Sequence, residues 1–136
     1  MRRVIVETPF AGKGETREER RQDFMQKRRY LAACLRDCFK RGETPYASHA
    51  IGPLALDDED PTERELGIRG GFAWRKVADA TVVYTDLGVS RGMEFGIAHA
   101  KECKHPVERR TLGDGWEELV TAKAHLHLSE EEKCSS

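Results

Sequence analysis

The sequence has no long apolar run, so it offers no segment of about 20 residues that could span a bilayer as a helix. It also lacks an excess of charge of one sign, because 23 Lys and Arg balance 24 Asp and Glu for a formal net charge of -1. We therefore expect neither a nucleic-acid polymer nor a membrane as a partner. No apolar signal region precedes Val4-Ile5-Val6, so we expect a cytoplasmic protein.

No two of the four cysteines have the CxxC spacing of common zinc and redox sites. Cys34 and Cys38 lie one helical turn apart, while Cys134 lies in a polar tail. A zinc site could be imagined from these two residues with Cys103 and His105. The simpler interpretation is that Cys34 and Cys38 are small apolar residues on a buried helix face. We expect no metal and no cofactor.

The 136 residues are enough for one hydrophobic core without disulfide or metal support. We expect a single domain over residues 1–128, followed by a polar tail at 129–136. Apolar periodicity and turn residues predict strands and helices in alternation. Strands are expected at 3–8, 44–49, 80–85 and 107–112, and helices at 27–41, 62–77, 90–103 and 116–126.

Two charged segments are expected as loops, at 10–26, with a short helix possible at 15–21, and at 51–61. Thr62 is the expected N-cap of the second helix, with Glu65 as its capping-box partner. The charged last strand is expected at a sheet edge. The β-α alternation predicts a flavodoxin-like three-layer α/β sandwich with a mostly parallel sheet of four to five strands.

Ligands of such sheets bind beyond the carboxyl ends of the strands, which selects residues 8–14, 48–52 and 86–94. In the third segment, Gly88 and Gly92 permit a tight turn near a ligand. Ser90 is a good N-cap whose following amides can face an anion, and Arg91 adds a positive charge. Glu94 lies in the first helical turn, where its carboxylate could act as a nucleophile or base.

Each candidate also has a purely structural interpretation. Glu94 could simply stabilise the helix dipole, and the local sequence alone favours that interpretation. Asp86 could be a cap or turn residue or a catalytic acid, with both alternatives equally open. His49 could be a hydrogen-bonded structural histidine or a site residue near a strand end.

The segment 78–83, a glycine-containing loop and the run 90–98 (Ser-Arg-Gly-Met-Glu-Phe-Gly-Ile-Ala) together resemble the nucleoside 2-deoxyribosyltransferases. The resemblance is greatest to their relatives, the 2'-deoxynucleoside 5'-phosphate N-hydrolases. It extends over residues 3–112 and includes Trp74, Ser48-His49-Ala50 and the turn at 8–12.

The resemblance implies a flavodoxin-like fold, a homodimer or higher homo-oligomer, and cleavage or transfer at an N-glycosidic bond of a small nucleoside or nucleotide. By motif position Glu94 would be the nucleophile that forms a sugar ester. The base must leave with a proton, and the local candidates for the acid that supplies it are Asp86, Asp79 and His49. The residues that would contact substrate are Pro9, Phe10, Ala11, Gly12, Gly88, Ser90, Arg91 and Gly92. Of these, Ser90, Arg91 and Gly92 would meet the 5'-phosphate if the substrate is a nucleotide.

The chain departs from the family at the helix before the third strand, where the family usually carries an aspartate. Residues 68–74 here contain no acid, and the nearest are Glu63 and Glu65, about two turns away. Two alternatives therefore stay open. The chain either catalyses cleavage with another group in place of this aspartate, or binds a nucleotide or nucleotide-derived signal without cleaving it.

Overall fold

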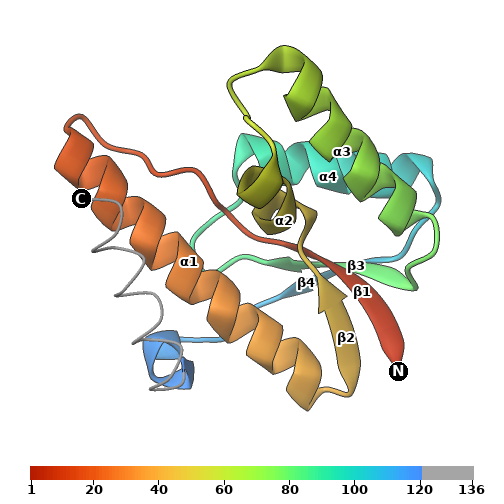
Figure 1. The fold of residues 1–136 in the computed structure, drawn as a ribbon. Coiled ribbons are helices and arrows are strands. Elements are labelled where there is room, and N and C mark those ends of the chain that lie inside the picture. The colour runs from red at the N-terminus through yellow and green to blue at the C-terminus, as the bar shows by residue number, and fades with distance from the viewer. Residues whose placement is uncertain (121–136) are drawn as a thin grey trace.

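The structure is a computed structural model in which residues 1–120 are described. A four-stranded parallel sheet with the order β2-β1-β3-β4 forms its centre. The flavodoxin-like three-layer α/β fold predicted from the sequence is confirmed, with helices on both faces of the sheet (Figure 1). The strands are β1 Arg2–Glu7, β2 Glu43–Tyr46, β3 Ala80–Tyr84 and β4 Val107–Arg110.

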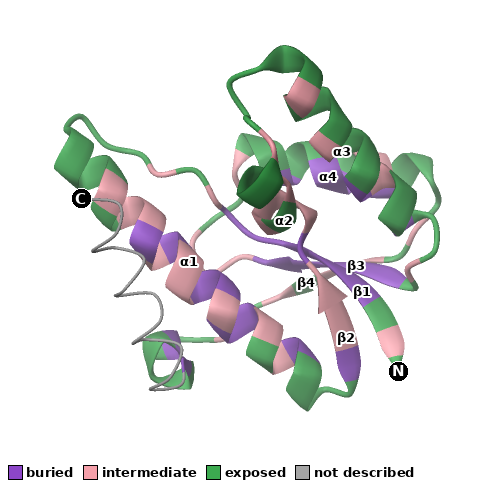
Figure 2. Ribbon diagram, in the orientation of Figure 1, coloured by how far each residue is buried: buried purple, intermediate pink, exposed green. Residues whose placement is uncertain are grey.

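The long helix α1, Arg17–Lys40, covers one face of the sheet together with the short 3-10 helix η1, Trp116–Leu119. Side chains of β1 and β3 that point to this face pack against the buried stripe of α1, which Figure 2 shows in purple. Cys34 and Cys38 are fully buried in that stripe, as predicted. This layer contains most of the hydrophobic core.

The opposite face is covered by α3, Pro61–Arg75, and α4, Arg91–Glu102, while α2, Ser48–Ala55, packs on α3 (Figure 1). Met93 and Ile97 of α4 form a second apolar cluster with Val83 of β3. Among residues 1–120, no helix is both long and apolar enough to cross a membrane.

Helix α1 begins ten residues earlier than the sequence analysis predicted, because much of the expected loop is helical. Thr16 is its N-cap: the side chain of Thr16 accepts a hydrogen bond from the backbone N–H of Glu19, and the Glu19 carboxylate accepts one from the backbone N–H of Thr16. Thr16 and Glu19 have the spacing of a capping box, which the density of charge in this segment obscured.

The region after β2 also differs from the prediction, since the strand ends at Tyr46 and residues 48–55 form α2 instead of strand and loop. Gly52 and Pro53 have low helix propensity, so the packing of α2 on α3 stabilises a helix that its own residues disfavour. The N-cap of α3 is Asp60, whose side chain accepts from the N–H of Thr62, and Pro61 occupies the first helical position. The prediction of Thr62 as the cap was therefore wrong by two residues.

For the last described elements, one prediction is confirmed and one differs from the structure. Strand β4 lies at the edge of the sheet, as its charge predicted. The predicted helix at 116–126 is only a 3-10 turn up to Leu119, and Val120 is already extended. The rest of that helix, the proposed domain boundary at residue 128 and the polar tail lie outside the described residues.

Candidate functional site

The segments that the sequence analysis selected do meet at one edge of the sheet. Because all four strands are parallel, the turn after β1, the start of α2 and the turn between β3 and α4 all lie at the carboxyl edge. Their side chains, however, point to different places. No described contact joins Glu94, Asp86 and His49 to one another.

Glu94 lies on the side of α4 that faces away from α3. The inward side of the helix carries Met93 and Ile97, which pack on β3. A second side carries Phe95 and His99, which both stack on Phe72 of α3. The helical period therefore places the exposed carboxylate of Glu94 toward the β4 edge.

A groove of about 370 Å³ runs along this side of α4 and contains Glu94. This volume is within the range of small-molecule sites, although the groove is open to solvent. Two cations, Lys101 and Arg109, line it with Glu94, and the remaining lining residues are apolar: Val89, Ile97 and Ala98. A larger apolar hollow, of about 460 Å³, lies between α1 and η1 and contains none of the predicted site residues.

The turn that precedes α4 has the predicted cap. The hydroxyl of Ser90 accepts a hydrogen bond from the N–H of Met93 at 3.2 Å, and the N–H of Ser90 is 3.3 Å from the Met93 sulfur. Gly88 has a φ of +85°, a conformation that side-chain-bearing residues rarely adopt. Arg91 and Gly92 are exposed on the first turn of α4.

The contacts of Asp86 are those of a residue that holds loops together. One oxygen accepts from the hydroxyl of Tyr30 on α1 at 2.6 Å, and both accept from the N–H of Leu112. The N–H of Gly113 donates to the second oxygen. Burial acts to raise the pKa of Asp86, but these hydrogen bonds outweigh it and hold the pKa below its ordinary value. An ionised, multiply bonded carboxylate is a poor proton donor, so we favour the structural alternative for Asp86.

His49 lies on the first turn of α2 and reaches the turn after β1. Its Nε2 is 2.8 Å from the hydroxyl oxygen of Thr8, and its ring meets that of Phe10 edge-on. Burial lowers the pKa of His49 to about 4, so the imidazole is neutral at pH 7. The Nδ1 atom is buried and has no hydrogen-bond partner among the described residues.

The predicted substrate wall at Pro9, Phe10, Ala11 and Gly12 packs closely on α1. The Lys27 ammonium donates to the carbonyl oxygen of Ala11 at 2.7 Å, and the ring of Phe10 lies edge-on to that of Phe24. A Cβ at Gly12 would overlap the backbone of α1, so glycine is required there. These contacts fix the turn at the carboxyl edge.

The sequence analysis missed a buried ion pair that joins β1 to the end of α3. An Nη atom of Arg75 lies 2.6 Å from a carboxylate oxygen of Glu7. Burial raises the pKa of Glu7 to about 6, against the opposing effect of Arg75. A Cβ at Gly96 of α4 would overlap the Glu7 carboxylate, so Gly96 lets α4 lie directly on this pair. An acid directly after the apolar run Val4-Ile5-Val6 was the available signal.

Within residues 68–74, where the resemblance to the nucleoside 2-deoxyribosyltransferases predicts an aspartate, Gly71 is closely packed. In the acid-free segment 68–74, Gly71 is buried in α3, and a Cβ there would lie 2.9 Å from the Cβ and Oγ atoms of Ser48. Helix α3 therefore approaches the start of α2 too closely for a carboxylate at this position.

The comparisons with known proteins agree with this fold. A 2-deoxyribosyltransferase from the psychrotolerant bacterium Bacillus psychrosaccharolyticus has a similar structure, with a TM-score of 0.55 and 15% sequence identity. The match covers 82% of this chain and 74% of that protein. No curated protein matches the sequence. A family model described as a domain of unknown function matches residues 2–110, and the chain therefore belongs to that family, DUF7768.

Proposed function

We propose that the protein breaks the N-glycosidic bond of a nucleoside or nucleoside 5'-monophosphate, with Glu94 as the nucleophile. The observation that carries this proposal is the place of Glu94. Its exposed carboxylate lines a groove of small-molecule size on the first turns of α4, within the Ser-Arg-Gly-Met-Glu-Phe-Gly-Ile-Ala run. The distant fold likeness to a 2-deoxyribosyltransferase supports the same chemistry.

The proposed reaction has two steps. An oxygen of Glu94 attacks the anomeric carbon, the carbon–nitrogen bond breaks with its electron pair, and the base leaves with a proton. Water or a second base then attacks the sugar ester and releases Glu94. Solvent supplies the proton in the first step, because Asp86 is ionised and His49 is neutral and directed toward Thr8.

The substrate is a small molecule that would occupy the groove without a cofactor. Three expectations stay predictions: the homodimer or higher homo-oligomer, the cytoplasmic location, and the substrate contacts of the turn at 9–12 and of Gly88, Ser90, Arg91 and Gly92. The proposal covers both hydrolysis and transfer to a second base.

Chromatography of a nucleoside and nucleotide panel after incubation with the protein tests the proposal. We expect release of free base by the unmodified chain and a loss of about a thousandfold or more in Glu94→Ala. Glu102→Ala is the matched control, because Glu102 is an exposed acid near the other end of the same helix. Equal release by the Glu94 and Glu102 variants would remove Glu94 from the mechanism.

A second candidate is a module that binds a nucleotide without cleaving it. The lack of an acid in residues 68–74 favours this alternative, because the resemblance predicts a carboxylate there. The close approach of Gly71 to Ser48 leaves no room for one at position 71. Calorimetry that detects binding of an intact nucleotide, with no free base after long incubation, would support the binding module and contradict the enzyme.

A further inference from the structure

We propose that Lys101 and Arg109 form a subsite for a phosphate monoester on the ligand that occupies the Glu94 groove. This inference rests on the proposed function, since it assigns a substrate class to the same groove. It differs from the sequence analysis, which placed the phosphate at Ser90, Arg91 and Gly92.

The sheet pleat places Arg109 in the groove. Successive residues of β4 point to opposite faces, and Val107 packs in the apolar cluster beneath α4. Arg109 lies two residues further on and therefore faces the same way, opposite Val83 in the register. Lys101 reaches the groove from α4, two turns or about 10 Å along the helix from Glu94.

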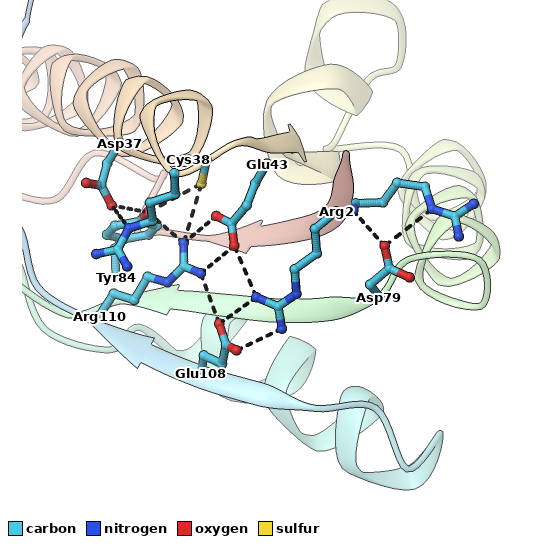
Figure 3. A network of polar contacts seen from close by, with 10 residues as sticks. Arg2, Asp37, Cys38, Glu43, Asp79, Tyr84, Glu108 and Arg110 are labelled. Atoms are coloured by element: carbon cyan, nitrogen blue, oxygen red, sulfur yellow. Dashed lines mark hydrogen bonds and ion pairs between the residues drawn. The ribbon is translucent and has the colours of Figure 1, made fainter.

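The charges of the groove are unpaired. Among residues 1–120, no ion pair within 4 Å involves Glu94, Lys101 or Arg109. Most other arginines that reach the sheet are paired: Arg110, the next residue, binds Glu43 and Glu108 on the other face (Figure 3). The groove thus holds two cations and one carboxylate. Lys101 and Arg109 suit a phosphate dianion at one end, and the sugar would lie at the Glu94 end.

Ser90, in the turn before α4, is less suited to bind the phosphate. The Ser90 hydroxyl already accepts from Met93, and the Ser90 N–H already faces the Met93 sulfur. Lys101 and Arg109 have no such internal partner among the described residues, so binding an anion there breaks no existing hydrogen bond.

Two molecules could present this phosphate, a nucleoside 5'-monophosphate or a free pentose 5-phosphate. Calorimetry would compare deoxyadenosine 5'-monophosphate, deoxyribose 5-phosphate and deoxyadenosine as probes. We expect the nucleotide to bind about tenfold or more tightly than the nucleoside. Comparable binding of the sugar phosphate would show that the phosphorylated sugar carries the recognition.

The variants Arg109→Gln and Lys101→Gln are each expected to weaken binding of the phosphorylated probes by about tenfold, with less than about twofold effect on deoxyadenosine. Arg64→Gln is the control for loss of one positive charge, because Arg64 is exposed on α3. Arg91→Gln tests the competing assignment. If it abolishes the preference for phosphate while Arg109→Gln does not, the subsite is wrong.

The two proposals fail separately. Base release that depends on Glu94 but shows no preference for phosphorylated substrate would overturn the subsite and leave the proposed function standing. Binding of the nucleotide that depends on Arg109, without any release of base, would support the subsite and overturn the N-glycosidic chemistry. Failure of all three probes to bind would overturn the subsite.

Discussion

Arg109 and Arg110 are neighbours in the sequence but lie in opposite electrostatic environments. Arg110 faces α1 and donates to both carboxylate oxygens of Glu43 at 2.7 Å, to Glu108 at 2.9 Å and to the Tyr84 hydroxyl at 3.2 Å. Figure 3 shows this arginine network, which Arg2 completes by binding Glu43 and Glu108. Arg109 faces α4 and has no ion-pair partner among the described residues.

The difference separates charges that hold the fold from charges that can bind a ligand. Hydrogen bonds to Glu43 come first among the causes that raise the pKa of Arg110, and hydrogen bonds from Arg2 lead those that lower the pKa of Glu108 to about 2. In the arginine network each charged group is compensated within the chain. In the Glu94 groove the compensation has to come from solvent or from a bound molecule.

The largest expected effect is on the arginine network. Arg110→Met should lower the free energy of unfolding by about 3–5 kcal/mol, because it leaves the buried Glu43 carboxylate with Arg2 alone. Denaturant unfolding measures the change. A loss below about 1 kcal/mol would show that the network contributes little and would weaken the comparison.

The next effect concerns His49, whose pKa falls from 6.5 to about 4 on folding. The unfolded chain binds the proton more readily than the folded chain. Protonation of His49 therefore does not lower the free energy of unfolding above pH 6.5, but lowers it by about 3 kcal/mol as the pH falls to 4. Glu7 acts in the opposite sense, since its raised pKa of about 6 costs stability as the pH rises from 4.5. The difference between the natural chain and His49→Gln isolates the histidine, and a flat difference between pH 4 and 6.5 would contradict its burial.

A smaller effect is expected at Gly96. Gly96→Ala places a methyl group against the Glu7 carboxylate and should cost about 1–3 kcal/mol of unfolding free energy. Gly70→Ala is the matched control in α3, because nothing lies within 4 Å of the added methyl group and alanine favours a helix. Thermal denaturation of both variants compares them, and equal midpoints would show that α4 does not rest on Glu7.

The smallest effect sharpens the comparison most. Arg109→Gln should change the free energy of unfolding by less than about 0.5 kcal/mol, since no described partner is lost. The same denaturant titration as for Arg110→Met measures it. A loss of more than about 2 kcal/mol would mean that Arg109 also has a structural role.

The sheet and its order could be predicted because the β-branched runs around Val4 and Val82 and the helices between them restrict the topology to few alternatives. Two helical boundaries could not. The capping box at Thr16 was hidden by charge, and α2 forms despite Gly52 and Pro53 because α3 packs on it. Local propensity and tertiary packing disagree there, and packing prevails.

The candidate site was predictable only in part. Helical spacing placed Glu94 near the start of α4, but the side of the helix that it faces depends on the stacking of Phe95 and His99 on α3. Arg109 lies near Glu94, and Arg75 pairs with Glu7, 68 residues away. Both contacts join segments far apart in the sequence, so no local pattern predicts them.

Intact-mass spectrometry of the protein after rapid mixing with deoxyadenosine 5'-monophosphate tests the central claim most directly. We expect an adduct with the mass of the phosphorylated deoxyribosyl group, mapped by peptide sequencing to Glu94 and missing from Glu94→Gln. Base release without an adduct at Glu94, undiminished in Glu94→Gln, would contradict the account.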